Sequence, residues 1–175
     1  AAFLRSMTAR SLIMCSRQTG KSTTIAALAV HTARYRPRAL VLIVAPSQRQ
    51  SHELFRKATQ FYQMAGPVDP EAESAQRLEL ENGSRIVALS GNAHTVRGYS
   101  APDLVILDEA AWIDDELFHG VTPMLAAGGR LIAMTTPFGQ RGWFWRMWRR
   151  FRSQWFGCAS GDRPPNHIRQ SCRHR

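Results

Sequence analysis

The sequence predicts an α/β protein with a mostly parallel β-sheet, helices on both of its faces and a hairpin at one edge. Three observations support this prediction. Continuous apolar runs that suit buried strands alternate with segments of helical periodicity. One pair of alternating segments flanks Asn82 and Gly83, a strong hairpin signal. The length of 175 residues corresponds to one domain with a substantial core.

The chain opens on a predicted strand, loop and helix. Residues 11–14 (SLIM) suit a short buried strand, and residues 23–35 are rich in alanine, with apolar residues at helical spacing. The loop between them, residues 15–22, reads CSRQTGKS. A helix that begins at Lys21 would direct unpaired N–H groups and the positive end of its dipole at an anion.

This loop matches most of a phosphate-binding pattern. In loops of the type G-x-x-x-x-G-K-[ST], backbone N–H groups surround the phosphates of a nucleotide, the lysine contacts the outer oxygens and the hydroxyl binds Mg²⁺. Gly20, Lys21 and Ser22 match the end of the pattern, whereas Cys15 replaces its first glycine. The predicted nucleotide-binding residues are Cys15, Ser16, Arg17, Gln18, Thr19, Gly20, Lys21, Ser22 and Thr23.

The middle of the chain supplies a central strand, a helix and the hairpin. Residues 39–45 (ALVLIVA) form a continuous apolar run, which is typical of a parallel strand buried on both faces. Residues 47–64 have the pattern of an amphipathic helix, with Ser47 as its N-cap. Residues 77–80 and 85–89 form the two halves of the hairpin, which we expect at an edge of the sheet.

Two further buried strands are predicted over residues 103–107 (DLVIL) and 130–134 (RLIAM). Asp108 and Glu109 follow the first strand, and two threonines follow the second. Strands that alternate with helices imply parallel pairing through right-handed crossovers. Because ligand sites of such sheets form at the carboxyl ends of the strands, we expect these side chains to converge on the phosphate loop.

Asp108 and Glu109 are candidates for two tasks in nucleotide hydrolysis. This reaction needs a held metal ion, an oriented water and stabilised charge on the transferring phosphate. Asp108 would reach a water on the Mg²⁺ that Ser22 also binds, and Glu109 would polarise the attacking water. The alternative is an N-cap followed by a first-turn carboxylate. The separate lysine and serine of the loop favour the catalytic interpretation.

Two arginines and two threonines are further candidates. Arg17 lies inside the loop, where it could neutralise charge on the outer phosphates as an arginine finger does; the alternative is a surface salt bridge. Arg97 precedes Gly98, so we expect it in an exposed loop, where it acts on a neighbouring subunit or is simply solvated. Thr135 and Thr136 could sense the outer phosphate and couple hydrolysis to movement, or form an ordinary turn before a proline.

An aromatic stripe marks the region after residue 142. It consists of Phe144, Trp148, Phe151 and Trp155 at helical spacing, with arginines elsewhere around the helix. We favour a core-packing helix over a nucleic-acid-binding surface. Residues 157–175 have no periodicity and few apolar side chains, which indicates a disordered basic tail.

Most of the net charge lies near the C-terminus. Of the formal charge of +10, residues 141–175 contribute +8, with nine arginines against Asp162. Such a strip favours the binding of polyanions, and a solvated face or a disordered tail accounts for the charge equally well.

The three cysteines are scattered along the chain, which fits a reducing compartment and no disulfide framework. Since no apolar run approaches the roughly 20 residues of a membrane helix and no signal peptide is visible, we expect a soluble intracellular protein.

Three ordered segments together resemble the ATPase domain of large terminase subunits of tailed bacteriophages, the motors that package DNA into proheads. They are CSRQTGKST (residues 15–23), VRGYSAPDLVILDEAA (96–111) and TTPFGQRGWFW (135–145), and the resemblance covers roughly residues 10–148. It implies an ASCE-type P-loop NTPase fold and a Mg²⁺-dependent ATPase. It also implies double-stranded DNA, portal and small terminase subunit as partners, a homo-oligomeric ring and the cytoplasm of a host bacterium.

The resemblance also implies roles for individual residues. Members of this family tolerate a non-glycine residue at the first loop position and carry an arginine inside the loop, as Arg17 is here. Their acidic motif places Asp108 on Mg²⁺ and makes Glu109 the catalytic carboxylate, and their coupling motif matches residues 135–137. In some members an arginine near the position of Arg97 acts across the subunit interface.

Two features depart from the family pattern. The glutamine segment that recognises adenine upstream of the loop is not present, so we expect residues 1–156 to be an ATPase domain with an incomplete N-terminal part. A nuclease domain needs several carboxylates, and Asp162 is the only acid after residue 140, so no nuclease activity is expected. Two alternatives are a degenerate prophage fragment that binds nucleotide or DNA without turnover, and a helicase-like P-loop ATPase.

Overall fold

The computed structural model describes residues 9–65 and 72–150. Strands and helices alternate along this part of the chain, as the sequence predicts. The strands are β1 (Arg10–Met14), β2 (Leu40–Ala45), β3 (Ala72–Glu73), β4 (Arg77–Glu79), β5 (Arg85–Ser90), β6 (Leu104–Leu107) and β7 (Arg130–Thr135). The helices are α2 (Lys21–Tyr35), α3 (Gln48–Met64), α4 (Ala93–Arg97), the 3-10 helix η1 (Ala110–Trp112), α5 (Asp115–Val121), the 3-10 helix η2 (Thr122–Met124) and α6 (Gly142–Arg150).

The described strands form one seven-stranded sheet in the order β1-β7-β6-β2-β5-β4-β3. The strands from β1 to β5 in this order pair in parallel, and the two outer pairs, β5 with β4 and β4 with β3, are antiparallel. The prediction of a mostly parallel sheet with a hairpin at one end is therefore confirmed. The structure adds the short outermost strand β3, which the sequence did not predict.

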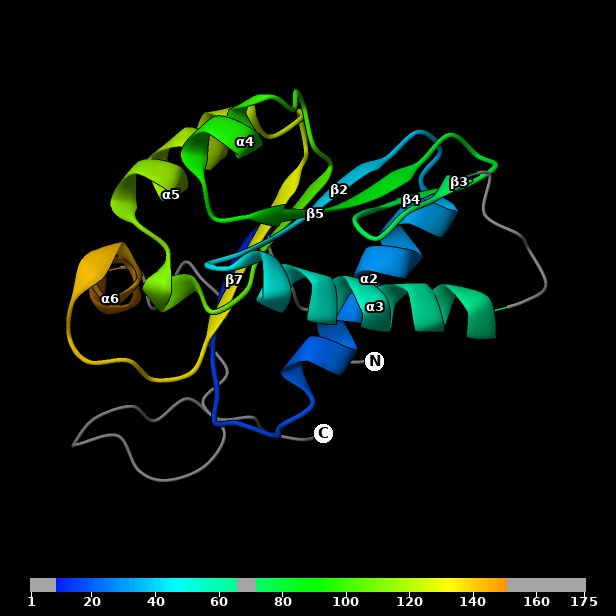
Figure 1. The fold of residues 1–175 in the computed structure, drawn as a ribbon. Helices are drawn as coiled ribbons and strands as arrows, with labels where there is room; N and C mark the ends of the chain where they lie inside the picture. The colour runs from blue at the N-terminus through cyan, green and yellow to red at the C-terminus, as the bar shows by residue number, and fades with distance from the viewer. Residues whose placement is uncertain (1–8, 66–71, 151–175) are drawn as a thin grey trace, which may run out of the picture.

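The helices cover both faces of the sheet (Figure 1). Strand β2 lies at the centre, and all six of its side chains are buried. Val41 and Ile43 belong to the apolar cluster under α2 and α3, whereas Leu42 and Val44 belong to the cluster under α4, α5 and α6. This alternation explains why the β2 sequence is apolar without interruption.

Side-chain hydrogen bonds fix the ends of several elements. Ser47 is the N-cap of α3 and forms a capping box with Gln50, which confirms the predicted start of this helix. In the hairpin loop, the Asn82 side-chain amide donates to the carbonyls of Ala33 and Arg34 at the end of α2. The hairpin is thereby attached to the helix that follows the phosphate loop.

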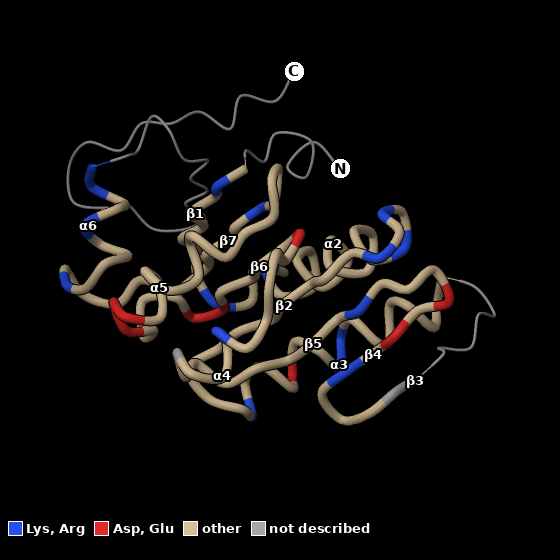
Figure 2. The backbone as a smooth tube through the Cα atoms, turned by 90° about the horizontal axis from the view of Figure 1, so that it is seen from above, with Lys and Arg blue, Asp and Glu red and all other residues tan. Residues whose placement is uncertain are grey.

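Helix α6 uses its aromatic residues for core packing. Phe144 and Trp148 of the predicted stripe are buried, together with Trp143, whose ring stacks on Phe118 at 3.9 Å between centroids. Phe151 and Trp155 lie outside the described residues, as does the predicted tail over residues 157–175. Figure 2 shows basic positions on α6 and acidic positions on the neighbouring α5.

Within the described residues, no helix is long and apolar enough to cross a membrane. Cys15 is a buried free cysteine, and the other two cysteines lie outside the described part of the chain.

Candidate functional site

The candidate site lies at the carboxyl ends of β1, β7 and β6. These strands are adjacent, so the segments that follow them meet at one edge of the sheet, as predicted. A pocket of about 800 Å³ opens there, between the loop after β1 and the start of α3. It is lined by Arg17, Gln18, Thr19, Gly20, Lys21, Ser22, Thr23, Pro46, Gln50, Lys57, Glu109, Trp112 and Thr136.

The loop after β1 has the backbone of an anion-binding turn. Gly20 is the N-cap of α2 in the left-handed conformation (φ 76°), and it has no side chain with which to accept hydrogen bonds from the first-turn N–H groups. No side chain caps these N–H groups, and the residues of the first turn, Lys21, Ser22 and Thr23, line the pocket. The Thr19 hydroxyl donates to the Ser16 carbonyl at 3.0 Å and closes the turn. A Cβ at position 20 would meet no atom within 4 Å, so φ alone favours glycine there.

Cys15 stands at the first loop position with its side chain in the core. It is 6% exposed and belongs to the apolar cluster under α2 and α3, and its N–H donates to the Thr135 carbonyl at 3.2 Å. Its side chain is therefore not among the groups that line the pocket. This placement gives a physical reason why the loop tolerates a residue other than glycine at this position.

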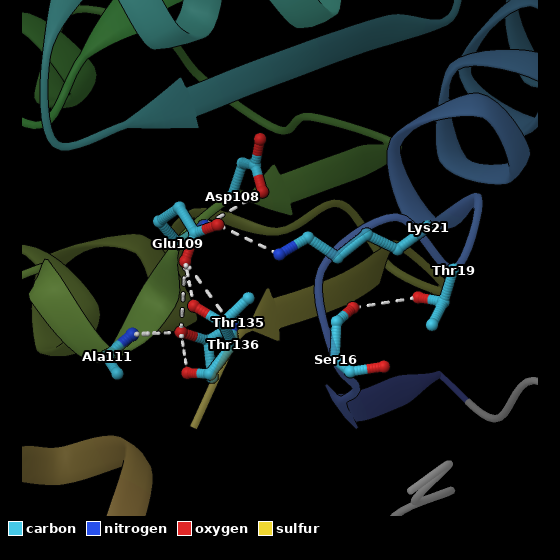
Figure 3. Close-up of polar contacts among 8 residues, drawn as sticks. All are labelled: Ser16, Thr19, Lys21, Asp108, Glu109, Ala111, Thr135 and Thr136. Carbon is cyan, nitrogen blue, oxygen red and sulfur yellow. Dashed lines mark hydrogen bonds and ion pairs between the residues drawn. The ribbon is translucent and has the colours of Figure 1, made fainter. Parts of the chain in front are cut away.

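Lys21 connects the loop with the acidic strand tip. Its ammonium donates to Oε1 of Glu109 at 2.8 Å, across 88 residues of sequence. Figure 3 shows Lys21 reaching from the loop toward Glu109, which projects from the end of β6. Both side chains are largely shielded from solvent, 12% and 22% exposed, so their interaction is stronger than that of a surface pair.

Glu109 is also held from the other side by the end of β7. Its Oε2 accepts hydrogen bonds from the Thr136 N–H at 3.3 Å, the Thr136 hydroxyl at 3.1 Å and the Thr135 hydroxyl at 3.4 Å (Figure 3). Burial raises the pKa of Glu109, but the hydrogen bond and charge of Lys21 and the Thr136 donors outweigh burial and lower the pKa below its usual value. Glu109 is therefore a fixed, ionised carboxylate.

Asp108 has a different environment from its neighbour. It is 8% exposed, and its Oδ1 accepts a hydrogen bond from the Glu109 N–H at 2.9 Å. Burial and the charge of Glu109 raise the pKa of Asp108 to about 6, against the opposing effect of Lys21 and Lys57. A buried carboxylate of this kind gains most from a bound cation. Carboxylate and hydroxyl oxygens are ligands that suit Mg²⁺. Ser22 lines the pocket, whereas Asp108 is not among its lining residues.

Neither carboxylate acts as a simple helix cap. Glu109 is the N-cap residue of η1, but its side chain makes no capping hydrogen bond, and its backbone has φ 47°, in the left-handed region. The left-handed backbone of a non-glycine residue at a strand tip is a strained conformation of the kind found at functional sites. The interpretation of these two acids as capping residues is therefore not supported.

The two candidate arginines lie in different places. Arg17 is exposed and lines the pocket, whereas Arg97 is exposed but does not line it. The prediction that Arg97 lies in a loop is wrong: it ends the short helix α4, because Asn92 caps that helix by accepting from the His94 N–H. The guanidinium of Arg97 donates to Glu116 of α5 at 3.0 Å.

The pocket also contains residues that sequence reasoning missed. Gln50 and Lys57 come from α3, and Trp112 comes from η1. Trp112 is 57% exposed and stacks on Phe138 at 3.5 Å between centroids. The spacing of seven residues between Gln50 and Lys57 places them on one face of α3. This spacing is the sequence signal by which the two residues could have been found.

A comparison with protein families identifies the chain. A model described as terminase large subunit, T4likevirus-type, N-terminal matches residues 12–167, which is most of the sequence. The chain belongs to this terminase family. The phosphate loop, the acidic strand tip and the threonine pair all lie within the matched residues.

Solved structures with the same fold are also terminases or packaging motors. The large terminase ATPase domain of Thermus phage P74-26 is similar, with a TM-score of 0.65 and 22% identity, over 84% of this chain and 66% of that one. The large terminase of another thermophilic bacteriophage matches with a TM-score of 0.72 and 10% identity, over 89% of this chain and 41% of that one. At these identities the likeness shows the fold of this terminase family member.

The second of these large terminases has also been solved in complex with ADP. In that form it matches with a TM-score of 0.69 and 12% identity, over 84% of this chain and 39% of that one. This terminase chain therefore spans 66% of the P74-26 domain and well under half of the longer large terminase.

Proposed function

We propose that this chain is the ATP-hydrolysing, DNA-translocating domain of a phage packaging motor. The observation that carries the proposal is the contact between Lys21 and Glu109, because it joins the phosphate loop to the acid that follows β6. A phosphate bound by the loop would compete with Glu109 for the Lys21 ammonium. Nucleotide binding would then change the contacts of Glu109, the residue best placed to orient a water.

The other residues of the site supply complementary functions. The N-terminal N–H groups of α2 would bind the phosphates, and Ser22 and Asp108 would hold Mg²⁺, which neutralises phosphate charge when bound. Arg17, exposed on the loop, would contact the outer phosphates. Thr135 and Thr136 contact Glu109 directly, so their hydrogen bonds would respond to its movement and pass it to β7.

The family supports proposals about partners as well. Because terminase large subunits act on DNA, we propose double-stranded DNA as the substrate of translocation, with portal and small terminase subunit as partners in the host bacterial cytoplasm. A structural neighbour is titled as the viral genome packaging motor assembly of bacteriophage Phi-29, with a TM-score of 0.57 and 10% identity, over 84% of this chain and 49% of that one. Assembly into a homo-oligomeric ring follows from the same proposal.

The proposal is tested by phosphate release from ATP in the presence of Mg²⁺, with and without DNA. Lys21→Ala and Glu109→Gln should each reduce turnover by at least about 100-fold, since each removes a group that contacts the reacting phosphate or water. Two matched controls lie on the exposed face of α3: Arg56→Ala and Glu53→Gln break only a surface ion pair of 3.0 Å and should leave turnover unchanged.

Turnover that persists in both site variants would refute the proposal. DNA retention without any phosphate release by the wild-type chain would instead favour a fragment that binds without catalysis. Strand separation stimulated by nucleic acid would favour a helicase-like ATPase.

A further inference from the structure

Lys57 lies in the pocket without a role in the proposed mechanism. Helix α3 starts directly after the carboxyl end of β2, so its first turns border the site. Side chains of a helix tilt toward its N-terminus, so a long side chain two turns into α3 reaches back toward the strand tips. Lys57 accordingly lines the pocket, together with Gln50 of the same helix.

The surroundings of Lys57 point to an anionic ligand. Its side chain is half-buried, and within residues 9–65 and 72–150 no carboxylate forms an ion pair with it. The other lysine of the pocket, Lys21, is already paired with Glu109. Lys57 lines the same pocket as Glu109, the acid that follows β6. A half-buried cation that faces a pocket and has no ion-pair partner gains by binding an anion there.

We propose that Lys57 is a phosphate-binding residue that contacts the outermost phosphate of a nucleoside triphosphate from the α3 side of the pocket. This inference rests on the proposed function, because it concerns the same site. The outermost phosphate is favoured over the inner ones because Lys57 shares the pocket with Glu109, the acid proposed to orient the water. The inner phosphates would lie closer to the N–H groups of α2, which would bind them without a second lysine.

The test compares binding of two nucleotides that differ in this phosphate. Dissociation constants for ATPγS and ADP, both with Mg²⁺, are measured by calorimetry for the wild-type chain and for Lys57→Met. The variant should weaken ATPγS binding by about 10-fold, as the loss of one charge-assisted hydrogen bond predicts, and should change ADP binding by less than about 3-fold. Lys57→Arg keeps the charge and should retain most of the ATPγS affinity.

The matched control is Arg56→Met, the neighbouring basic residue of α3, which is exposed and paired with Glu53. It should alter neither affinity. Equal weakening of ATPγS and ADP by Lys57→Met would overturn the inference, because it would show a general effect on the pocket; so would unchanged binding of both. Should Lys57→Met fail to fold, the same comparison is made between Lys57→Gln and Lys57→Arg.

Failure of this inference can be distinguished from failure of the proposed function. A wild-type chain that binds neither nucleotide refutes the proposed nucleotide site and this inference together. Suppose that the wild-type chain binds ATPγS, that Lys21→Ala does not bind it and that Lys57→Met still does. This result would refute only the inference.

Discussion

Asp108 and Glu109 are adjacent, yet the pKa values of their carboxylates are shifted in opposite directions. Glu109 faces Lys21 and the Thr136 donors, which lower its pKa, whereas burial raises the pKa of Asp108 to about 6. The ionised form of Asp108 is thus costly in the folded protein and cheaper in the unfolded chain. A residue that would bind a metal ion is in this way a source of instability, as expected of a site selected for function.

Asp108→Asn should therefore stabilise the fold while abolishing Mg²⁺-dependent turnover. The pKa of Asp108 is raised from 3.8 to about 6 in the folded protein. The destabilisation of the fold by ionised Asp108 is therefore absent below pH 4, grows between pH 4 and 6 and is complete above pH 6. The free energy of unfolding of Asp108→Asn should exceed that of the wild type by about 1 to 3 kcal/mol at pH 7.5. Urea unfolding without metal at pH 7.5 and pH 4 measures this difference, and an equal gain at both pH values would contradict the assignment.

Thr136 offers a second prediction about a single side chain. Thr136→Val keeps the shape and the backbone N–H but removes the hydroxyl that donates to Glu109 at 3.1 Å. Loss of one hydrogen bond of about 1 kcal/mol should lower the turnover number about five-fold, with ATP binding unchanged. Steady-state kinetics separate these two quantities. Thr122→Val, which removes a hydroxyl bonded to the Phe118 carbonyl on α5, is the control and should leave turnover intact.

The residues of the site were predictable to different degrees. The phosphate loop, the two acids and the two threonines could be read from the sequence because each directly follows a strand. The contact of Lys21 with Glu109 could not, since it depends on how far two side chains extend across the pocket. Lys57 was missed because only the packing of α3 against the sheet brings that face of the helix to the site.

At the scale of elements, α6 shows how a basic segment can still be part of the core. Its arginines are exposed, and Arg146 pairs with Asp115 of α5, while Phe144 and Trp148 are buried against the sheet cluster. The Trp143 indole N–H donates to the Ile113 carbonyl at 2.9 Å and fixes α6 to the segment after η1. The helix thus anchors the part of the chain that follows the acidic strand tip.

Truncation of Trp148 tests the interpretation of the aromatic stripe. Trp148→Ala should lower the free energy of unfolding by about 3 kcal/mol because it leaves a cavity in the core. Arg149→Ser, one residue further on the exposed side, should change stability by less than about 0.5 kcal/mol. Chemical denaturation measures both. Similar, small effects of the two variants would instead favour a surface role for the stripe.

The elements that the sequence failed to predict are the short ones. Strand β3 has two residues, too few for an alternating pattern, and it exists because β4 offers it a hydrogen-bonding edge. Helix α4 has five residues and depends on its Asn92 cap. By contrast, β2 and α3 were predicted with nearly correct bounds, because their patterns extend over six or more residues.

For the whole molecule, Arg97 and Glu109 belong to different surfaces of the chain. Arg97 does not line the pocket, and its guanidinium pairs with Glu116. If Arg97 acts on a nucleotide, that nucleotide would therefore be bound to a neighbouring subunit. We expect Arg97→Ala and Glu109→Gln each to be inactive alone, and an equimolar mixture to regain measurable phosphate release. The mixture provides intact Arg97 from one chain and intact Glu109 from the other. A mixture as inactive as its components would argue that both residues act within one chain.

The parallel architecture was predictable from the alternation of strands and helices, but the order of the strands was not. Sequence patterns indicate which segments are strands, whereas their order depends on which crossover packs best over the whole sheet. The placement of β7 between β1 and β6 brings the threonine pair between the phosphate loop and the acids.

This strand order has a consequence for how the domain folds. Among the described strands, β1 pairs with β7 alone, so its partner is synthesised more than a hundred residues later. Of these strands, β1 leaves the ribosome before the others and must wait for β7 before it can join the sheet. Contacts so distant in sequence form slowly. We therefore expect the phosphate loop, although it is made before most of the sheet, to be among the last parts of the domain to acquire its native shape.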